Sequence, residues 1–323
     1  MAPKNMKNEC PGNRKKFLLT GASGLLGSNL IYFLRRHFDI LGLYHRHLIQ
    51  INGAAVKGVN ICDREDIRRV IVDFDPEIVV HAAALADVDK CEDQPGLAQA
   101  INVKGTQNVV DALAGLNAKL VFISTDQVYD GVKGFSKEDE PVRPINVYAK
   151  TKVEAERIVL SRPHSLVLRT NLFGWDVVKK RSLAEWCITE LKKGKKINGF
   201  SDVVFSSIYT RDFANLLVGL LEENADGVFN LGSREPISKF SFLVKIAKLA
   251  RLDEKSISEA FLYDAHLRAP RGKHLSMDVS KLMACLDAMI PTTEQSIKRF
   301  MTDRAAGVPG MLRKCVVPSK EHC

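Results

Sequence analysis

The sequence contains no long run of apolar residues. A helix that crosses a bilayer needs about 20 consecutive apolar residues, and no segment of the 323 residues comes near that length. Residues 1–15 are polar and basic without an apolar stretch, which is unlike a secretory signal. We therefore expect a cytoplasmic globular protein with no membrane among its partners.

Cysteines with metal-binding spacing are missing as well. The chain has seven scattered cysteines, an odd number, and no two of them have CxxC spacing. Zinc sites and disulfide frameworks depend on closely spaced or even-numbered cysteines. The sequence therefore predicts reduced thiols and no metal site.

The chain also lacks a basic patch in its central part, although its formal net charge is +9. Residues 1–16 carry five Lys or Arg against one acid, and residues 298–323 carry six against two. Between them, 36 basic residues stand against 35 acidic ones. Nucleic-acid binding needs a basic face on a folded surface, so we expect no nucleic-acid partner. We predict a flexible basic tail at 1–15 and a poorly ordered tail at 301–323.

The first half of the chain alternates short apolar runs with amphipathic stretches. Strands are predicted at 16–20, 40–44, 78–81 and 119–124. Helical spacing of apolar residues occurs at 24–36, 64–74, 97–113 and 147–160. Short, mostly apolar strands are typical of a parallel sheet that is buried on both faces. The alternation predicts an α/β fold with a doubly wound, Rossmann-like parallel sheet.

The second half is less regular. A strand is predicted at 166–169 and another at 228–231. Helices are predicted at 183–193 and 238–250, the second with Ser238 as its cap. This change of pattern predicts a second, smaller unit.

A glycine-rich turn follows the first predicted strand. Gly21, Gly24 and Gly27 have GxxGxxG spacing directly before a predicted helix. Such glycines permit a tight turn, close approach of a pyrophosphate and close packing of helix on strand. The pyrophosphate would meet free N–H groups at the positive end of the helix dipole. In this context the turn predicts a dinucleotide site, and a glycine-rich helix start used only for packing is the alternative. The residues assigned to the turn are Gly21, Ser23, Gly24, Leu25, Leu26 and Gly27.

The end of the second predicted strand indicates which dinucleotide is bound. An NAD site usually offers an acid to the ribose 2′-hydroxyl about 20 residues beyond the glycines. Here the stretch reads Tyr44-His45-Arg46-His47, without an acid. Because Arg46 would attract a 2′-phosphate, the sequence favours NADP(H) over NAD(H). A solvated loop arginine is the alternative.

These features divide the chain into two predicted domains. Residues 16–171 and 206–232 would form an NADP-binding Rossmann domain. Residues 172–205 and 233–300 would form a smaller, discontinuous α/β substrate-binding domain that closes over the first.

Tyr148 and Lys152 have YxxxK spacing on a predicted helix. Residues four apart share a helix face, so both side chains can point into one site. A neighbouring ammonium brings the pKa of a phenol closer to working pH. The common alternative for this spacing is a surface tyrosine beside a solvated lysine.

Thr125 follows the strand predicted at 119–124. Ligands bind at the carboxyl ends of the strands in open α/β sheets. The Thr125 hydroxyl could hydrogen-bond a substrate carbonyl while Tyr148 supplies a proton, and a hydroxyl that only caps its own backbone is the alternative. We therefore predict that Thr125, Tyr148 and Lys152 are catalytic residues.

Four motifs in this order resemble the extended short-chain dehydrogenase/reductase superfamily: TGxxGxxG from residue 20, HAAA from residue 81, STD from residue 124 and YxxxK from residue 148. Within it, residues 124–131 (STDQVYDG), 146–148 and 271–282 resemble the dTDP-4-dehydrorhamnose reductase group. The resemblance spans residues 16–300. It implies that Thr125 polarises the carbonyl, Tyr148 donates the proton and Lys152 holds the nicotinamide ribose. The other cofactor contacts that it implies, beside Tyr44, His45 and Arg46, are Asn60 and Ile61 at the adenine and Ala82, Ala83 and Ala84 at the phosphates and ribose.

The substrate side departs from the family pattern at two points. The family often has a tryptophan two residues after the position of Thr170, and here that residue is Leu172. The late arginine motif is usually Arg-Pro-Arg, whereas residues 268–271 read Arg-Ala-Pro-Arg. The sugar or the nucleotide can therefore differ from those of the family's namesake. Candidate substrate residues are Asp126, Asn171, Trp175, Arg211, Arg268 and Arg271, with Lys273 as a further candidate for holding phosphates.

The resemblance implies an NADPH-dependent reductase of a 4-keto-6-deoxy sugar nucleotide, in deoxysugar biosynthesis, and a homodimer. A 4,6-dehydratase of the superfamily needs an Asp-Glu pair, and here Asp126 is followed by Gln127, which cannot act as acid or base. Two alternatives stay open. One is an NAD(P)-dependent sugar-nucleotide epimerase, and the other is a non-catalytic NADP-binding regulatory subunit, like the beta subunit of methionine adenosyltransferase.

Overall fold

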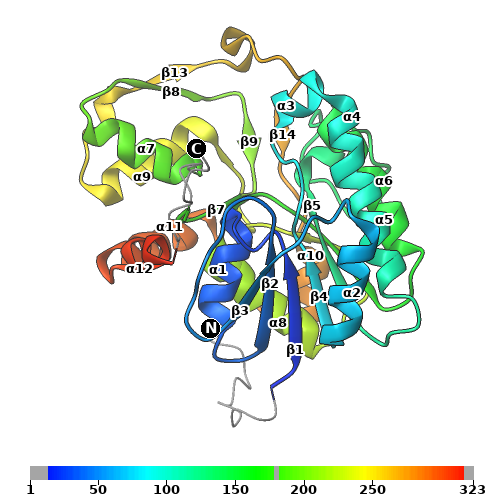
Figure 1. The fold of residues 1–323 in the computed structure, drawn as a ribbon. Helices are drawn as coiled ribbons and strands as arrows, with labels where there is room; N and C mark the ends of the chain where they lie inside the picture. The colour runs from blue at the N-terminus through cyan, green and yellow to red at the C-terminus, as the bar shows by residue number, and fades with distance from the viewer. Residues whose placement is uncertain (1–13, 178–181, 316–323) are drawn as a thin grey trace, which may run out of the picture.

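The computed structural model describes residues 14–177 and 182–315. A seven-stranded sheet forms its centre, with the strand order β11-β6-β5-β4-β1-β2-β3 (Figure 1). Every neighbouring pair in this sheet is parallel. This confirms the predicted doubly wound α/β fold. The strands are β1 (Lys16–Thr20), β2 (Asp39–Tyr44), β3 (Ala55–Gly58), β4 (Ile78–His81), β5 (Lys119–Thr125), β6 (Ser165–Thr170) and β11 (Gly227–Leu231).

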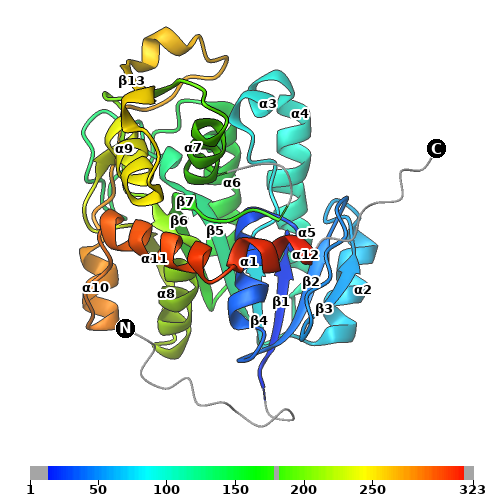
Figure 2. The same ribbon diagram turned by 90° about the vertical axis from the view of Figure 1, so that its left-hand side faces the viewer.

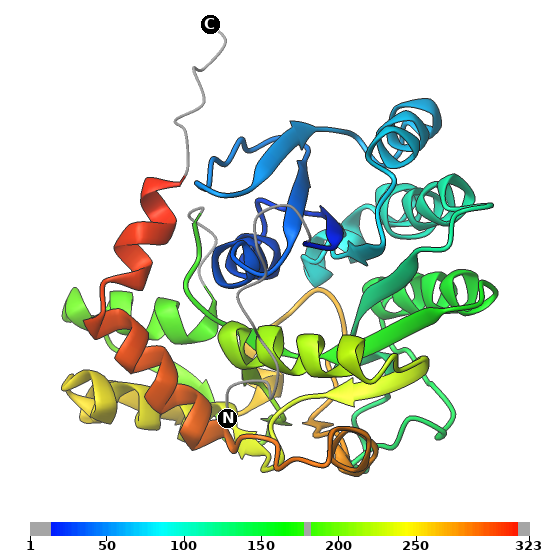
Figure 3. The same cartoon turned by 90° about the horizontal axis from the view of Figure 1, so that it is seen from below.

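Helices cover both faces of the sheet, as the view from below shows (Figure 3). On one face lie α1 (Leu25–Leu34) and α8 (Thr210–Glu222). On the other lie α2 (Arg64–Phe74), α5 (Gly105–Ala112) and α6 (Val147–Leu160). Successive residues of β1 alternate between the two cores: Leu19 packs into the α1 side and Leu18 into the α2 side. The short apolar strands of the sequence are therefore buried on both faces.

The segment predicted as one helix at 97–113 is divided. It begins with α4 (Pro95–Ala98), continues as a π-helical segment, η1 (Gln99–Lys104), and ends with α5. A short helix that the sequence did not reveal, α3 (Val88–Asp93), precedes it. Single-turn π segments occur frequently at functional sites, and this one packs against α6.

A smaller lobe stands over the carboxyl edge of the sheet (Figure 1). Its helices are α7 (Leu183–Lys192) and α9 (Lys239–Ala250), and Ser238 caps α9 as predicted, accepting from the Ser241 amide. Its strands are β8 (Ile197–Phe200) with β13 (Ile257–Ala260), and β12 (Ile237–Ser238), β9 (Val204–Phe205) and β14 (His274–Leu275). Two short strands, β7 (Leu172–Phe173) and β10 (Ile208–Tyr209), pair where the chain passes between the lobes. None of the helices in the described part of the chain combines the length and apolarity that crossing a bilayer requires.

The prediction of a poorly ordered tail from residue 301 is wrong for residues 301–314. Helix α11 (Thr293–Ala305) continues past that point, and α12 (Val308–Lys314) follows it along α1 (Figure 2). Phe300 and Leu312 are fully buried in the core. Charged residues between the apolar positions hid this amphipathic pattern. Residues 1–13, most of the first predicted tail, and residues 316–323, the end of the second, lie outside the described residues.

Helix α10 (Ser280–Leu286) belongs to the sheet layer, although it falls within the predicted second segment of the substrate domain. It packs on β11 and α8, and Lys281 donates a hydrogen bond to the Val228 carbonyl. The chain therefore returns to the sheet before α11 begins.

Candidate active site

The turn between β1 and α1 has the shape of a phosphate-binding loop. Gly21 has a φ of +73°, and a Cβ there would lie 2.8 Å from the Ala83 nitrogen. A Cβ at Gly27 would collide with the Gly21 carbonyl. No side chain caps the N-terminus of α1, so the first-turn N–H groups are left to an external acceptor. The glycines thus form a cradle that a larger residue would fill, which fits a dinucleotide pyrophosphate.

The loop after β4 lies against this turn. The Ala83 amide donates to the Thr20 hydroxyl (3.1 Å), which also pairs with the His81 ring (2.7 Å). Burial and then the Lys152 charge lower the pKa of His81 to about 3, so the ring is neutral. Ala82, Ala83 and Ala84 are only partly buried. The predicted cofactor-side alanines are therefore held in place beside the glycine turn.

The residues predicted at the adenosine end lie after β2 and β3. His45, Arg46 and Asn60 are exposed, and Tyr44 is partly buried with its ring against Gly58. Arg46 makes no hydrogen bond or ion pair with any residue that the structure describes. Ile61 is buried, and its carbonyl accepts from Asn108 (3.0 Å).

The three predicted catalytic residues are brought to the carboxyl edge of the sheet. Thr125 ends β5, and its hydroxyl donates to Asp126 (3.1 Å) and accepts from the Gln127 amide (3.2 Å). Tyr148 lies in the first turn of α6 and is 9% exposed. Burial and then the Asp126 charge raise the pKa of Tyr148, whereas a hydrogen bond with Thr125 opposes this shift. The Tyr148 phenol and the Thr125 hydroxyl therefore interact at this edge of the sheet.

Lys152 follows Tyr148 by one turn of α6. Its ammonium donates to the Ile123 carbonyl (2.7 Å) and lies 3.9 Å from the centre of the Phe122 ring. Burial lowers the pKa of Lys152 to about 7, although the charge of Glu156 opposes the shift. The amine is thus positioned at the end of β5 and can titrate close to neutral pH.

Asp126 and Asn171, two predicted substrate residues, lie in the same cluster. Asp126 is fully buried, and the Asn171 amide donates to its carboxylate (2.8 Å). Burial raises the pKa of Asp126 to about 6. The charges of Asp126 and Lys239, the first residue of α9, influence each other across the two lobes.

Two of the predicted substrate residues are placed elsewhere. Trp175 is 3% exposed and stacks on Phe300 at 4.0 Å. Arg211 pairs with Asp303 (2.6 Å) and lies over the ring of Phe33. Phe33 is near the C-terminal end of α1, whereas the glycine turn lies at the N-terminal end of that helix. The structure therefore corrects the expectation for both, because packing on α11 occupies the indole and the guanidinium.

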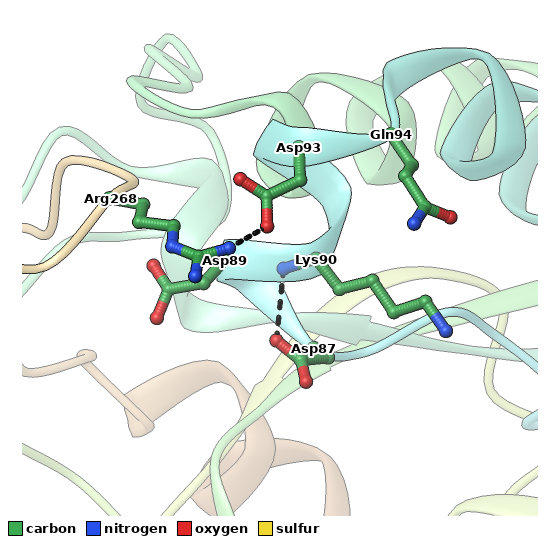
Figure 4. Close-up of a pocket in the computed structure, with 6 residues that line it drawn as sticks. All are labelled: Asp87, Asp89, Lys90, Asp93, Gln94 and Arg268. Atoms are coloured by element: carbon green, nitrogen blue, oxygen red, sulfur yellow. Dashed lines mark hydrogen bonds and ion pairs between the residues drawn. The ribbon is translucent and has the colours of Figure 1, made fainter.

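The late arginines bridge the two lobes. Arg268 pairs with Asp93, and Arg271 pairs with Asp89 (3.1 Å), both on α3. Lys273 pairs with Asp202 (2.9 Å) within the smaller lobe. Beside Arg268 is a polar cleft of about 500 Å³ (Figure 4), lined by Asp87, Asp89, Lys90, Asp93, Gln94 and Arg268.

Two functional-site residues were missed at the sequence level. Asn102, in the π-helical segment, bonds both the amide and the carbonyl of Leu85 and the Thr151 hydroxyl. Asn102 thereby connects the loop after β4 to α6. The charge of Lys239, on the other lobe, acts on Asp126. Neither stands in a motif with recognisable spacing, so only the tertiary arrangement reveals them.

A family model described as RmlD substrate binding domain matches residues 15–305. The chain belongs to the RmlD substrate binding domain family. This confirms the predicted resemblance to the sugar-nucleotide reductase group of the extended short-chain dehydrogenases. At the level of the family, the chain is an oxidoreductase related to dTDP-4-dehydrorhamnose reductases.

Individual relatives carry different names. The probable low-salt glycan biosynthesis reductase Agl14 of Haloferax volcanii is 27% identical over 86% of this chain and 95% of its own. Methionine adenosyltransferase 2 subunit beta of Xenopus tropicalis is 30% identical over 84% of this chain and 82% of its own. The crystal structure of dTDP-4-dehydrorhamnose reductase from Bacillus anthracis, in complex with NADP, is 25% identical with a TM-score of 0.82, over 90% of this chain and 100% of its own.

Proposed function

We propose that this RmlD-family chain is an NADPH-dependent reductase that converts the 4-keto group of a 4-keto-6-deoxy sugar nucleotide into a hydroxyl group. The observation that carries the proposal is the interaction of the Thr125 and Tyr148 hydroxyls at the carboxyl edge of the sheet, the same edge at which β1 leads into the glycine turn. Ligands of open α/β sheets bind at this edge. The family assignment supports the same class of reaction.

Tyr148 is the proton donor. Burial and the Asp126 charge raise its pKa, so the phenol carries its proton at neutral pH, which a donor requires. Thr125 hydrogen-bonds the same carbonyl oxygen and stabilises the negative charge that develops there. As the proton leaves, the Lys152 ammonium one turn away stabilises the phenolate.

The cofactor would be held along the same edge. The glycine turn would bind the pyrophosphate through the free N–H groups of α1. Arg46 is exposed and would attract a 2′-phosphate. Lys152 would hold the nicotinamide ribose, and Asn60 with Ile61 would flank the adenine. When bound, NADPH supplies the hydride that is added to C4. The NADP complex of the Bacillus anthracis relative supports this choice of cofactor.

The sugar would lie between the lobes. Asn171 is partly exposed and bonded to the buried Asp126 next to Thr125, and it would contact a sugar hydroxyl. Arg271 is mostly buried (side chain 17% exposed) and reaches the lobe boundary from the substrate side. Its charge acts on Lys239, whose own charge acts on Asp126, which supports Arg271 as a ligand for a substrate phosphate.

A second candidate is an NADP-binding regulatory subunit. It is favoured by the 30% identity to methionine adenosyltransferase 2 subunit beta. Such a protein would need the cofactor site, whereas the Thr125–Tyr148–Lys152 arrangement would have no role in it.

The deciding experiment is NADPH oxidation with a panel of 4-keto-6-deoxy sugar nucleotides that differ in nucleotide, each repeated with NADH. Rapid oxidation with one member, lost in Tyr148→Phe, is the expected result and names the substrate. If every member is inert while calorimetry shows NADPH binding, the reductase proposal fails. Interconversion of sugar epimers without net NADPH loss would then identify an epimerase, and no turnover would favour the subunit.

A further inference from the structure

Residues 268–274, which we call the strap, leave the smaller lobe and lie across α3. The Ala269 amide donates to Asp89 (3.0 Å), and the Arg271 guanidinium bonds the same carboxylate (3.1 Å). Arg268 pairs with Asp93 one turn further along α3 (Figure 4). The hydrogen bond from the Ala269 amide lowers the pKa of Asp89. Burial opposes this shift, but the charges of Arg271 and Arg268 add to it, so the pKa is lowered overall. The strap is thus fastened to α3 by charge-assisted bonds, which are the stronger kind.

The strap is also fastened to the loop after β5. The amides of Lys273 and His274 both donate to the Gly131 carbonyl (3.2 and 2.7 Å). A Cβ on Gly131 would lie 2.6 Å from the Gly272 Cα. The backbone of the strap and the backbone of the loop after β5 are therefore in direct contact.

Asn146 joins the strap to the helix that carries Tyr148. Its side-chain oxygen accepts from the Ala149 amide (2.8 Å) and so caps α6. Its amide nitrogen donates to the Pro270 carbonyl in the strap (3.0 Å) and to the Gln127 side-chain oxygen (3.1 Å). Asn146 itself is 1% exposed, whereas its partner Pro270 lies at the surface.

Capping of α6 alone does not explain why residue 146 is an asparagine. Serine and aspartate cap helices about as well as asparagine. Only asparagine offers an acceptor to the helix together with two N–H donors for two carbonyl oxygens. The chain supplies one acceptor from the strap and one from the segment that follows Thr125 and Asp126. The residue therefore meets three parts of the proposed site at once.

We propose that Asn146 is a positioning residue that couples the seating of the strap on α3 to the placement of Tyr148. The inference rests on the proposed reductase function for its catalytic consequence only. When the strap is seated, Pro270 holds the Asn146 amide, and the Asn146 oxygen fixes the first turn of α6. When the strap moves away from α3, the Asn146 side chain loses its bond to Pro270, and Tyr148 loses its fixed position relative to Thr125.

The first test replaces the donor and keeps the cap. In Asn146→Asp, a carboxylate still accepts from the Ala149 amide but faces two carbonyl oxygens without a donor. We expect the strap amides of Ala269 and His274 to exchange hydrogen about tenfold faster. Thr292→Asp, a cap change on the distant helix α11, is the matched control and should leave strap exchange unchanged. Unchanged strap exchange in Asn146→Asp would overturn the proposal.

The second test works in the opposite direction. Asp89→Asn keeps an acceptor for the Ala269 amide but removes the charge that holds Arg271, so the strap should loosen and the Ala149 amide should exchange faster. Asp66→Asn is the matched control, because Asp66 also lies in the first turn of a helix and pairs with an arginine, Arg69. If the Ala149 amide exchanged hydrogen at the same rate in Asp89→Asn and Asp66→Asn, the coupling between the strap and α6 would be contradicted.

The kinetic constants for NADPH oxidation distinguish a positioning role of Asn146 from a merely structural one. In Asn146→Asp we expect kcat to fall about tenfold because the proton donor is misplaced, while the Kd for NADPH is unchanged. An unchanged kcat would overturn the catalytic consequence. If the unmodified protein reduces no sugar nucleotide, the proposed function fails, and the two exchange experiments still decide whether Asn146 couples strap and helix.

Discussion

Glu156 of α6 and Arg169 of β6 form a doubly hydrogen-bonded ion pair inside the protein, with nitrogen–oxygen distances of 3.1 and 2.8 Å. Their exposed fractions are 3% and 5%. The Ser124 hydroxyl donates to the same carboxylate (2.5 Å), and the Arg169 guanidinium also donates to the Tyr129 hydroxyl (2.9 Å). The pair therefore binds the helix of Tyr148 and Lys152 to the strands that end at the site.

Removing one member of this pair should cost more stability than removing both. Arg169→Met leaves a buried carboxylate unpaired, and we expect a loss of about 3–5 kcal/mol in the free energy of unfolding. Adding Glu156→Leu removes the orphaned charge and should restore part of the loss. Urea unfolding measures both. Arg69→Met, which breaks an exposed pair with Asp66, should cost less than about 1 kcal/mol, and an equal cost would show that Arg169 is not specially paired.

Tyr148→Phe should remove the proton donor and leave the fold intact. We expect the rate of NADPH oxidation to fall about 10²–10⁴-fold, the usual contribution of a positioned acid, with unchanged NADPH binding by calorimetry. Tyr263→Phe is the control, because that phenol is 75% exposed and should not affect the rate. Full activity in Tyr148→Phe would exclude this phenol from the mechanism.

The sheet and the glycine turn could be predicted because local patterns determine them. Strands such as Lys16–Thr20 are continuous apolar runs, and α2 has the apolar spacing and Asp63 cap of an amphipathic helix. The glycine turn needs backbone conformations and close approaches that only glycine permits. Each of these features is contained in a few adjacent residues.

Part of the substrate side could not be predicted, because some of its candidate residues make contacts far along the chain. Trp175 was expected at the sugar, but it stacks on Phe300, which is 125 residues away. Arg268 was expected at a phosphate, but it meets Asp93 on a short helix that the sequence did not reveal. Charge alone does not tell whether a ligand or a neighbouring carboxylate neutralises an arginine.

Arg46→Asp should weaken NADPH binding much more than NADH binding. Arg46 is exposed without a partner among the described residues, so the substitution disturbs no internal contact, and an acid repels a 2′-phosphate but accepts from a 2′-hydroxyl. Calorimetry with both cofactors measures the effect, and a loss of about tenfold or more for NADPH corresponds to about 1.4 kcal/mol. Arg68→Asp, at an exposed position on α2, is the control. Equal weakening of both cofactors in Arg46→Asp would contradict recognition of the 2′-phosphate.

Asp126→Asn should stabilise the protein at neutral pH and not in acid. Burial raises the pKa of Asp126 to about 6 from 3.8, so the folded state binds a proton that the unfolded state releases between these values. The stability that this proton contributes is present below 3.8 and is lost as pH rises through about 6.

Asparagine has the same shape and does not ionise, so the difference between variant and original isolates this one group. His81, whose pKa is lowered to about 3, titrates over the same range with the opposite sign but is common to both proteins. At about 1.4 kcal/mol per pKa unit, the advantage of Asp126→Asn in urea unfolding should grow by about 3 kcal/mol from acid to neutral pH. Asp89→Asn is the opposite case, because bonds to the Ala269 amide and Arg271 lower that pKa, so its disadvantage should grow over the same range. Parallel pH profiles for Asp126→Asn and the original protein would show that Asp126 ionises as readily in the folded protein as in the unfolded chain, which would contradict the raised pKa.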